Sequence, residues 1–367
     1  MRRRTYVRCA AGGSIAGLAG CFTTDDPEPE PEREEEEPVD AEADGTLRIA
    51  TYESMVTGDD PAGAWLAERF AESFPDAELE WTVPDSGIDH FVQRYRRDAE
   101  IDADVYLGLT VGDLVLADGR GASRLFDSID VDRLEHADRV RDDLAVDDPD
   151  DRIVPVATGE VALVYDETTI RPPATLEALL ADEYADAVLA EDPRYSLPGR
   201  AFLCWTVAEY GDEFADYWAD LSASGLEVAD SWTDAYVDRY LEGEGSVVVS
   251  YTTDPVAAAS SDRAPERHRV ATPEGRAIGS TEGVGIFAGT ENVDLAHEFV
   301  DFVLSRDAQS AIAARNYQFP AVEDPYVDRP DAFDAAADPE ETIAVTYDDL
   351  SGSLDDWLTE WEAVLAP

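Results

Sequence analysis

Aromatic, hydroxyl and acidic side chains recur in this sequence where predicted strands end. Tyr52-Glu53 closes a strand predicted over 46–52, and Tyr251-Thr252-Thr253-Asp254 closes one predicted over 245–251. Side chains of these types contact ligands through ring faces, hydroxyl groups and carboxylates. In α/β folds, ligands bind at the ends of the strands. The pattern therefore predicts a ligand site built from these positions.

A predicted helix start adds backbone amides to this set. Ser196-Leu197-Pro198-Gly199 precedes a helix, and the amides of a helix N-terminus can hold an anionic group. Trp232 lies just ahead of another helix start, and Tyr317 lies in a loop after a helix. Core packing is the alternative for both, because Tyr236 and Tyr240 continue the stripe of Trp232 at intervals of four residues.

No catalytic constellation accompanies these residues. The four histidines have no metal-binding spacing, and we expect each to lie at the surface; they are His90, His136, His268 and His297. The sequence also lacks a GxSxG nucleophile motif, a P-loop and paired CxxC motifs. We therefore expect a binding protein without catalysis, cofactor or metal. A secreted α/β hydrolase is the alternative from another class, and a structural surface lipoprotein is a third.

Strands that alternate with helices must position the candidate residues. Strand patterns over 46–52, 78–83 and 104–109 alternate with helical spacing near 65–70 and 88–97. This order predicts parallel βαβ units and an α/β sheet.

Later segments predict a second lobe inserted into the first. Residues 153–165 form a long strand-like crossover, and 281–288 reads as a return strand, whereas 260–282 is weakly patterned. Helices are expected at 176–181, 199–210, 214–222, 295–304, 308–314 and 354–365. We predict a first lobe over 46–155 and 280–367 with the C-terminal helix, a second lobe over 156–279, and a ligand cleft between them.

The N-terminus has the features of a targeting segment. Arg2-Arg3-Arg4 precedes Thr5-Tyr6-Val7, close to a twin-arginine pattern, and a short apolar run follows. That run of about eleven residues is too short to span a bilayer, which needs about 20. It ends in Leu18-Ala19-Gly20-Cys21, which resembles a lipobox with acylation at Cys21. Residues 1–21 are thus predicted to be a lipoprotein signal.

Residues 22–45 are predicted to be a tether that holds the body near the outer face of the membrane. Their Pro-Glu repeats cannot bury apolar surface, and their like charges extend the chain. With Cys9 in the signal and Cys21 lipidated, only Cys204 remains in the body, so no internal disulfide is possible. Its apolar neighbours predict a buried structural thiol.

The charge of the chain is strongly negative. Its 367 residues carry 83 acidic and 27 basic side chains, a formal net charge of −56, and every basic residue apart from histidine is arginine. Such a surface repels nucleic acid, and its self-repulsion needs high ionic strength to be screened. We expect adaptation to high salt, as in halophilic microbes; a merely acidic surface is the alternative. We expect a monomer.

Several segments resemble one family, the thiamine-binding components of ABC transporters. TYESM (51–55) is similar to the family's TYDSF, and ADVYLGL (103–109) to ADVVLGL. EDPRYSLPG (191–199) resembles DPRTSTPG, and 231–255 follows a stretch that ends in SYTTSP. ARNYQFP (314–320) and WLTEWEAVL (357–365) resemble GNWMYP and WISEWQRAV. The resemblance runs in order from about residue 46 to the end.

The resemblance implies a two-lobed, type II periplasmic-binding-protein fold that closes on thiamine or its phosphates and delivers them to a permease with a separate ATPase. Trp232, Tyr251 or Tyr317 would stack on the thiazolium cation, and Glu53 or Asp254 would pair with it. The same fold binding ferric iron, a polyamine or an anion is the alternative. The implied ligand contacts are Tyr52, Glu53, Thr110, Val111, Ser196, Leu197, Trp232, Tyr251, Thr252, Thr253, Asp254 and Tyr317.

Overall fold

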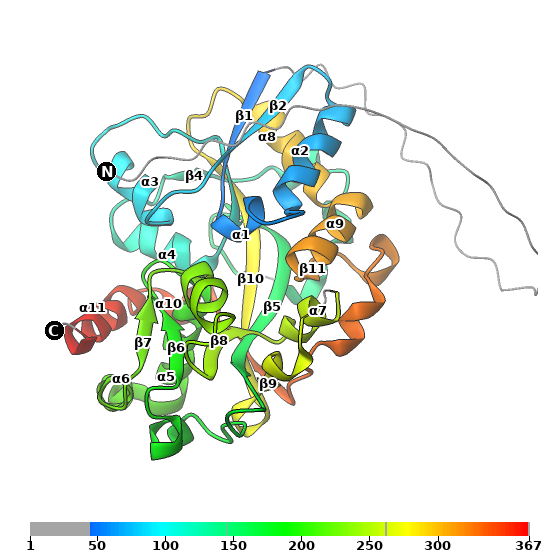
Figure 1. Ribbon diagram of the computed structural model, residues 1–367. Helices are drawn as coiled ribbons and strands as arrows, with labels where there is room; N and C mark the ends of the chain where they lie inside the picture. Colours follow the sequence, from blue (N-terminus) through cyan, green and yellow to red (C-terminus); the bar gives the residue numbers. More distant parts are fainter. Residues whose placement is uncertain (1–44, 145, 261–262, 366–367) are drawn as a thin grey trace, which may run out of the picture.

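The computed structural model describes residues 45–144, 146–260 and 263–365 (Figure 1). The predicted signal, Cys21 and nearly all of the predicted tether lie outside these residues. Within the described ranges, no helix combines the length and apolar character needed to cross a bilayer.

The first lobe is built on parallel strands with helices on both faces. Its apolar strand residues, such as Leu47 and Ile49, are fully buried, as the alternating pattern predicted. The strands are β1 (Gly45–Ala50), β2 (Ala77–Thr82) and β3 (Val105–Leu109). The helices that follow them are α1 (Glu53–Val56), α2 (Ala62–Ser73), α3 (Ile88–Tyr95) and α4 (Val111–Gly119).

The second lobe repeats this arrangement with shorter strands. β6 lies between β7 and β8 and is parallel to both. The strands are β6 (Val188–Glu191), β7 (Glu227–Ala229), β8 (Val247–Tyr251) and β9 (Arg269–Ala271). The helices are α5 (Leu197–Tyr210), α6 (Phe214–Ala223), a π-helix (Thr233–Tyr240) and α7 (Asp254–Ala259).

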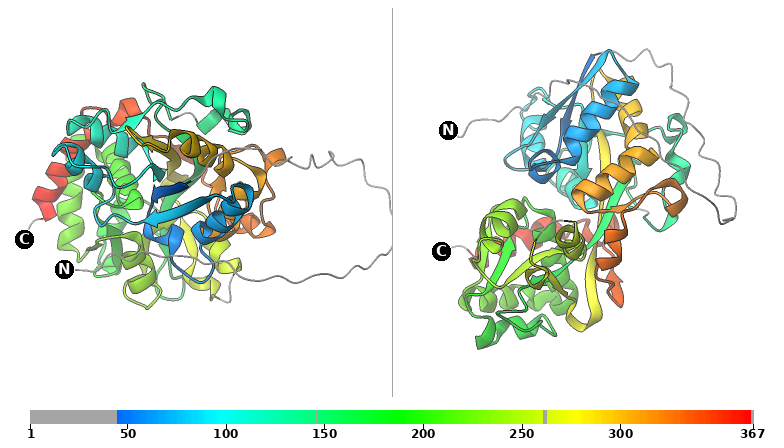
Figure 2. Two further views of the ribbon diagram at one scale, coloured as in Figure 1. Left: turned by 90° about the horizontal axis from the view of Figure 1, so that it is seen from above. Right: turned by 45° about the vertical axis from the view of Figure 1, so that its right-hand side comes forward.

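Two long strands join the lobes (Figure 2). β5 (Val154–Tyr165) and β10 (Arg276–Phe287) are antiparallel neighbours in the centre of the sheet order β2-β1-β3-β10-β5-β8-β6-β7. The last residues of β10 pair with β3, whereas the last residues of β5 pair with β8. The chain therefore crosses between the lobes within strands, and the parallel sheet predicted from βαβ units is antiparallel at its centre.

The return segment covers both lobes. α8 (Val293–Val303) and α9 (Arg306–Asn316) pack on α2. β12 (Glu341–Ile343) pairs with the first residues of β10, and the short β4 (Phe126–Asp127), from earlier in the chain, pairs with its last residues. β11 (Phe319–Pro320) pairs with β5. After α10 (Tyr347–Leu350), the C-terminal helix α11 (Leu354–Leu365) packs on α6 of the second lobe and on α4 of the first.

The predicted elements differ from the observed ones in several places, of which three concern longer elements. Helix α4 was not predicted, and the helix expected at 176–181 is a 3-10 helix over Glu177–Leu180. Strand β10 begins at Arg276, inside the segment described above as weakly patterned. Its first half carries polar, partly exposed residues because only β5 and the short β12 flank it there.

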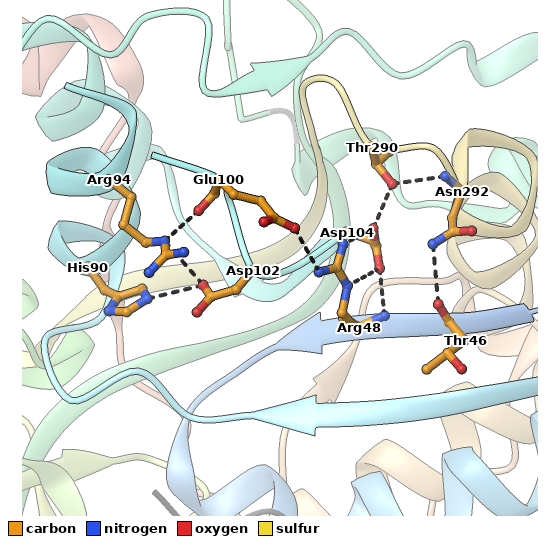
Figure 3. A network of polar contacts seen from close by, with 9 residues as sticks. All are labelled: Thr46, Arg48, His90, Arg94, Glu100, Asp102, Asp104, Thr290 and Asn292. Carbon is orange, nitrogen blue, oxygen red and sulfur yellow. Dashed lines mark hydrogen bonds and ion pairs between the residues drawn. The ribbon is translucent and has the colours of Figure 1, made fainter. Parts of the chain in front are cut away.

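A polar network fixes the outer end of the first lobe (Figure 3). The Arg48 guanidinium donates from Nε and Nη2 to the two carboxylate oxygens of Asp104, both at 3.0 Å. Asp104 is fully buried, and Thr290 Oγ1 donates to its Oδ1 at 2.7 Å. Asn292 Nδ2 donates to the Thr46 carbonyl oxygen at 3.2 Å. These bonds tie β1, the residue before β3 and the loop after β10 together.

Candidate functional site

Tyr52 follows β1 and lies at the junction of the lobes. Asn316 Nδ2 donates to Tyr52 Oη at 2.8 Å, and Tyr52 Oη donates to Gln318 Oε1 at 3.3 Å. The ring packs against Gly108 of β3. A side chain at this position would clash with it, because a Cβ there would lie 2.5 Å from Tyr52 Cε1. Gly108 of β3 thus leaves room for the ring, and Asn316 and Gln318 at the end of α9 hold its hydroxyl group.

Glu282 is the carboxylate at the centre of this group, and the sequence analysis missed it. It is 5% exposed, and its Oε2 lies 3.7 Å from the Cβ position on Gly108. Burial raises the pKa of Glu282 to about 7, although its contacts with Gln318 and Tyr52 act to lower it. A charged residue inside the apolar strand pattern of 281–288 was the available signal.

Tyr251 and Trp232 form an aromatic pair in the second lobe. Their ring centroids lie 6.5 Å apart with planes inclined by 56°. Trp232 stacks on Tyr236 and donates from Nε1 to Ser250 Oγ at 3.0 Å. Burial raises the pKa of Tyr251, and the nearby carboxylate of Glu282 adds to this. The electrostatic influence of Glu282 on both Tyr52 and Tyr251 shows that residues from both lobes meet here.

Glu191 is a second buried carboxylate near Tyr251. Glu191, at the end of β6, is fully buried, and neither carboxylate oxygen has a hydrogen-bond partner within the described residues. Burial raises its pKa well above the ordinary range, which favours the neutral form. Like Glu282, Glu191 also raises the pKa of Tyr251.

The residues after Tyr251 make structural contacts. Thr252 Oγ1 donates to Glu160 Oε2 at 2.8 Å, and Thr253 is the N-cap of α7. Asp254 is buried, and its Oδ2 lies 2.7 Å from Nδ1 of His268. His268 is 3% and His297 7% exposed, so the expectation that all histidines lie at the surface is wrong for these two. His268 is buried because it packs between Asp254 and the Tyr236 hydroxyl.

Two helix starts carry another four of the predicted residues. Thr110 is the N-cap of α4 and Val111 its first residue; Ser196 is the N-cap of α5 and Leu197 its first residue. Both caps are buried, and the two apolar residues are half-buried. The helix starts come from opposite lobes.

Tyr317 and Glu53 lie apart from the aromatic pair. Tyr317 has a positive φ of 54° at the end of α9 and packs against a separate cluster with Val256 and Phe333. Glu53 is exposed. The structure therefore brings Tyr52 and Tyr251 near Glu282 and places Trp232 against Tyr251. Tyr317 itself packs elsewhere, whereas its neighbours Asn316 and Gln318 contact Tyr52.

The lobes touch around this region. Asp113 in α4 and Arg200 in α5 form an ion pair with Oδ1 and Nη1 2.8 Å apart. A Cβ on Gly87 would lie 3.7 Å from the Tyr195 carbonyl oxygen. A surface hollow of about 470 Å³ lies elsewhere, beside β11, and is lined by Arg141, Val322 and Arg329 among others. The two lobes are thus in direct contact through α4 and α5 and through Gly87 and Tyr195.

The described residues offer little for metal or thiol chemistry. They contain no group of three or more histidine, cysteine or acidic side chains placed to hold a metal ion. Cys204 is buried and free, as predicted, and burial raises its pKa to about 12. A protonated, buried thiol is a poor nucleophile.

Comparison with known proteins agrees with this geometry. The model of the family described as bacterial extracellular solute-binding protein matches residues 118–350. The chain belongs to this family.

Two comparisons cover nearly the whole described chain. A thiamine-binding periplasmic protein of Brucella suis biovar 1 (strain 1330) is 30% identical over 88% of this chain and 93% of its own length. The corresponding protein of Escherichia coli (strain K12) is 28% identical over 87% and 93%. Both relatives are described as periplasmic proteins that bind thiamine.

Solved structures show the same two-lobed fold. A periplasmic thiamin binding protein superposes with a TM-score of 0.76 at 27% identity, over 89% of this chain and 98% of that one. A ferric binding protein from Campylobacter jejuni gives a TM-score of 0.70 at 15% identity, over 87% and 99%. The predicted fold class is thereby confirmed.

Proposed function

We propose that this chain captures thiamine outside the cytoplasm and delivers it to an ABC transporter permease with a separate ATPase. The relatives named above support the ligand class. One observation carries the proposal: Trp232 and Tyr251 lie together, and the buried carboxylate of Glu282 lies near Tyr251. A planar organic cation needs ring faces and a negative group in a dry site.

The chemistry of each group fits one part of such a ligand. A ring face contributes about 0.5–2 kcal/mol to binding of a delocalised cation, more when water is excluded. Glu282 in its ionised form supplies the opposite charge, and Gln318 with Asn316 supplies amide groups for an aromatic amine. We propose that these groups bind the ligand without catalysing a reaction.

Titration in molar salt tests the proposal. Thiamine added to the purified protein should quench tryptophan fluorescence with a Kd of about a micromolar or lower. Trp232→Ala should weaken the binding, while Trp65→Phe, in α2 of the first lobe, serves as the matched control. A response to another solute with none to thiamine would contradict the proposal.

Ferric iron is the second candidate because Tyr52 and Tyr251 both lie near Glu282. Phenolate and carboxylate oxygens are hard ligands that suit ferric iron. Iron bound to phenolates produces a visible charge-transfer band. A band that appears on addition of ferric citrate and disappears in Tyr52→Phe would favour iron; a colourless mixture favours the organic cation.

The finer features of the chain form part of the proposal. We propose lipid anchoring at Cys21 after a twin-arginine signal, a monomeric body, and lobes that divide near residues 155 and 280. The position of β5 and β10 across the junction supports that division. Mass spectrometry of the N-terminal peptide tests lipidation, and gel filtration tests the monomer.

Adaptation to high salt is likewise proposed from the net charge of −56. Screening shortens the range of repulsion from about 10 Å at 0.1 M to about 3 Å at 1 M salt. The melting temperature should therefore rise markedly between dilute buffer and molar KCl. A melting temperature that does not change with salt would favour a merely acidic surface.

A further inference from the structure

Glu191 is a buried acid without a partner. It ends β6 and is fully buried, and neither Oε1 nor Oε2 has a hydrogen-bond partner among the residues that the structure describes. Buried polar groups are almost always hydrogen-bonded, because burial without a bond costs free energy. An unpaired buried acid therefore needs a specific explanation, and a bound molecule that supplies the missing bonds is one.

The sheet places Glu191 beside the aromatic pair. β6 lies between β7 and β8, and all three strands are parallel, so their carboxyl ends share one edge. Glu191 pairs in register with Ala229 on β7. On β8, Leu189 pairs with Val248. Two residues further along, Glu191 therefore lies level with Ser250.

Glu191 also lies on the same face of the sheet as Trp232. Side chains alternate between the two faces of a strand, so Glu191 shares the face of Leu189. Leu189 packs in one apolar cluster with Tyr236, and Trp232 packs against the same cluster. Trp232 Nε1 donates to Ser250 Oγ at 3.0 Å. Glu191 thus lies close to the indole that contacts the ligand under the proposed function.

The end of β6 faces the first lobe. The loop that follows Glu191 contains Tyr195, and a Cβ on Gly87 of the first lobe would lie 3.7 Å from the Tyr195 carbonyl oxygen. Gly199, at the start of α5, packs on the backbone of Glu191, because a Cβ there would lie 2.4 Å from the Glu191 carbonyl oxygen. This close packing holds the strand end at the junction of the lobes.

Burial decides which hydrogen bonds Glu191 can make. It raises the pKa of Glu191 well above the ordinary range, so the group is a neutral carboxylic acid. A neutral carboxyl group donates through its O–H and accepts through its C=O. An amine next to a ring nitrogen in an aromatic heterocycle offers the complementary pair, an N–H donor and a nitrogen acceptor. Glutamine and asparagine read the edge of adenine with the same pair of bonds.

We propose that Glu191 recognises the aminopyrimidine half of the ligand, as hydrogen-bond donor to a ring nitrogen and as acceptor from the amine. This rests on the proposed function and names the residue that reads the neutral ring, while the aromatic pair and Glu282 attract the thiazolium cation. The amide groups of Asn316 and Gln318 can pair with the second amine hydrogen and the other ring nitrogen.

A pair of ligands separates the two halves. A benzyl analogue keeps the thiazolium ring and the hydroxyethyl arm of thiamine and carries a phenyl ring in place of the aminopyrimidine. In calorimetric titrations, the unmutated protein should bind thiamine about tenfold or more tightly than the analogue, because the analogue cannot make the two hydrogen bonds. Equal affinities would overturn the inference and leave the proposed function intact. If neither compound binds, the proposed function itself fails.

Two substitutions test Glu191 itself. Glu191→Gln keeps one donor and one acceptor and should retain the advantage of thiamine over the analogue. Glu191→Met keeps a similar size but has neither, so this advantage should fall about tenfold while the affinity for the analogue stays. Without ligand, Glu191→Met should melt at an equal or higher temperature, because an unpaired buried polar group is gone. Glu227→Met, at an exposed position on β7, is the matched control and should leave both affinities unchanged.

The outcomes that contradict the role of Glu191 are distinct. An advantage of thiamine that survives in folded Glu191→Met would show that this side chain does not read the aminopyrimidine. Equal loss in Glu191→Gln and Glu191→Met would contradict the paired hydrogen bonds. If melting shows that Glu191→Met is unfolded, Glu191→Gln still decides, since loss of the advantage there contradicts the pairing and its retention supports it.

Discussion

The indole of Trp232 lies nearly parallel to the phenol of Tyr236, with ring centroids 4.7 Å apart and planes inclined by 11°. Tyr236 is 2% exposed and is held by its hydroxyl contact with His268. The hydrogen bond from Trp232 Nε1 to Ser250 Oγ restrains the indole from turning within its own plane. One face of the indole is therefore covered, and the other is oriented before any ligand arrives.

Trp232→Ala should weaken thiamine binding by about 2- to 30-fold, the equivalent of about 0.5–2 kcal/mol. Trp232→Phe should lose less, because a smaller ring face remains. Calorimetric titration of both variants measures the effect. Equal affinity for the two variants and the unmutated protein would show that the indole does not contact the ligand.

Binding should depend on pH through Glu282. Burial raises the pKa of Glu282 to about 7, with Asp113 acting in the same direction and Gln318 and Tyr52 against it. An ionised carboxylate pairs with a cation and a neutral one does not, so affinity should rise as pH increases through about 7. Glu282→Gln should flatten this dependence between pH 6 and 8; titrations at several pH values provide the measurement.

The same residue should affect stability with a definite sign. Because the folded pKa of Glu282 is raised, the folded protein without ligand binds the proton more tightly than the unfolded chain does. Stability therefore falls as pH rises from about 4.5 to about 7 and then levels off. Glu282→Gln should raise the melting temperature at pH 8 and have little effect at pH 4.5. A lower melting temperature at pH 8 would contradict a buried, unfavourable charge.

Asp104→Asn should destabilise the first lobe. Burial acts to raise the pKa of Asp104, but its hydrogen bonds from Arg48 and Thr290 outweigh burial and lower it. Loss of these charged bonds should cost about 1.5–3 kcal/mol. The contribution is present above the ordinary pKa of 3.8 and is lost as pH falls through the lowered one. Thermal melts should therefore separate Asp104→Asn from the unmutated protein more widely at pH 7 than at pH 3.

Gly199→Ala should disturb the start of α5. A Cβ there would lie 2.4 Å from the Glu191 carbonyl oxygen, and backbone cannot move aside cheaply. Gly119→Ala is the matched control, since its Cβ would meet no atom within 4 Å and alanine favours the helix. We expect a lower melting temperature for the first and an unchanged or higher one for the second.

The fold was largely predictable because strand and helix patterns are local. The crossover expected at 153–165 is β5, and the closing helix expected at 354–365 is α11. The length of β10 was underestimated because its first half has no apolar alternation. Its pairing with β5 was not predicted because it joins residues far apart in sequence. Such partners follow from the whole sheet and not from a window of sequence.

The site was predicted in part. Trp232 and Tyr251 were both expected in the ligand site because one precedes a helix start and the other ends a strand, and their rings lie close together. Asp254 was expected to face the ligand, yet it contacts His268, a partner 14 residues away whose position the pattern does not encode. Glu282 was missed although it is a charged residue inside the strand pattern of 281–288, because the sequence does not show that this one acid among 83 is buried.

The uninterrupted course of β5 and β10 through the junction determines how the molecule can flex. Motion of one lobe against the other must bend these two paired strands. The register between these strands shifts at Glu282/Gly283, and that between β10 and β3 shifts at Gly283/Val284. We expect bending to concentrate at these two register shifts. Glu282, which we propose pairs with the ligand's positive charge, then also lies where the two strands bend when a ligand binds.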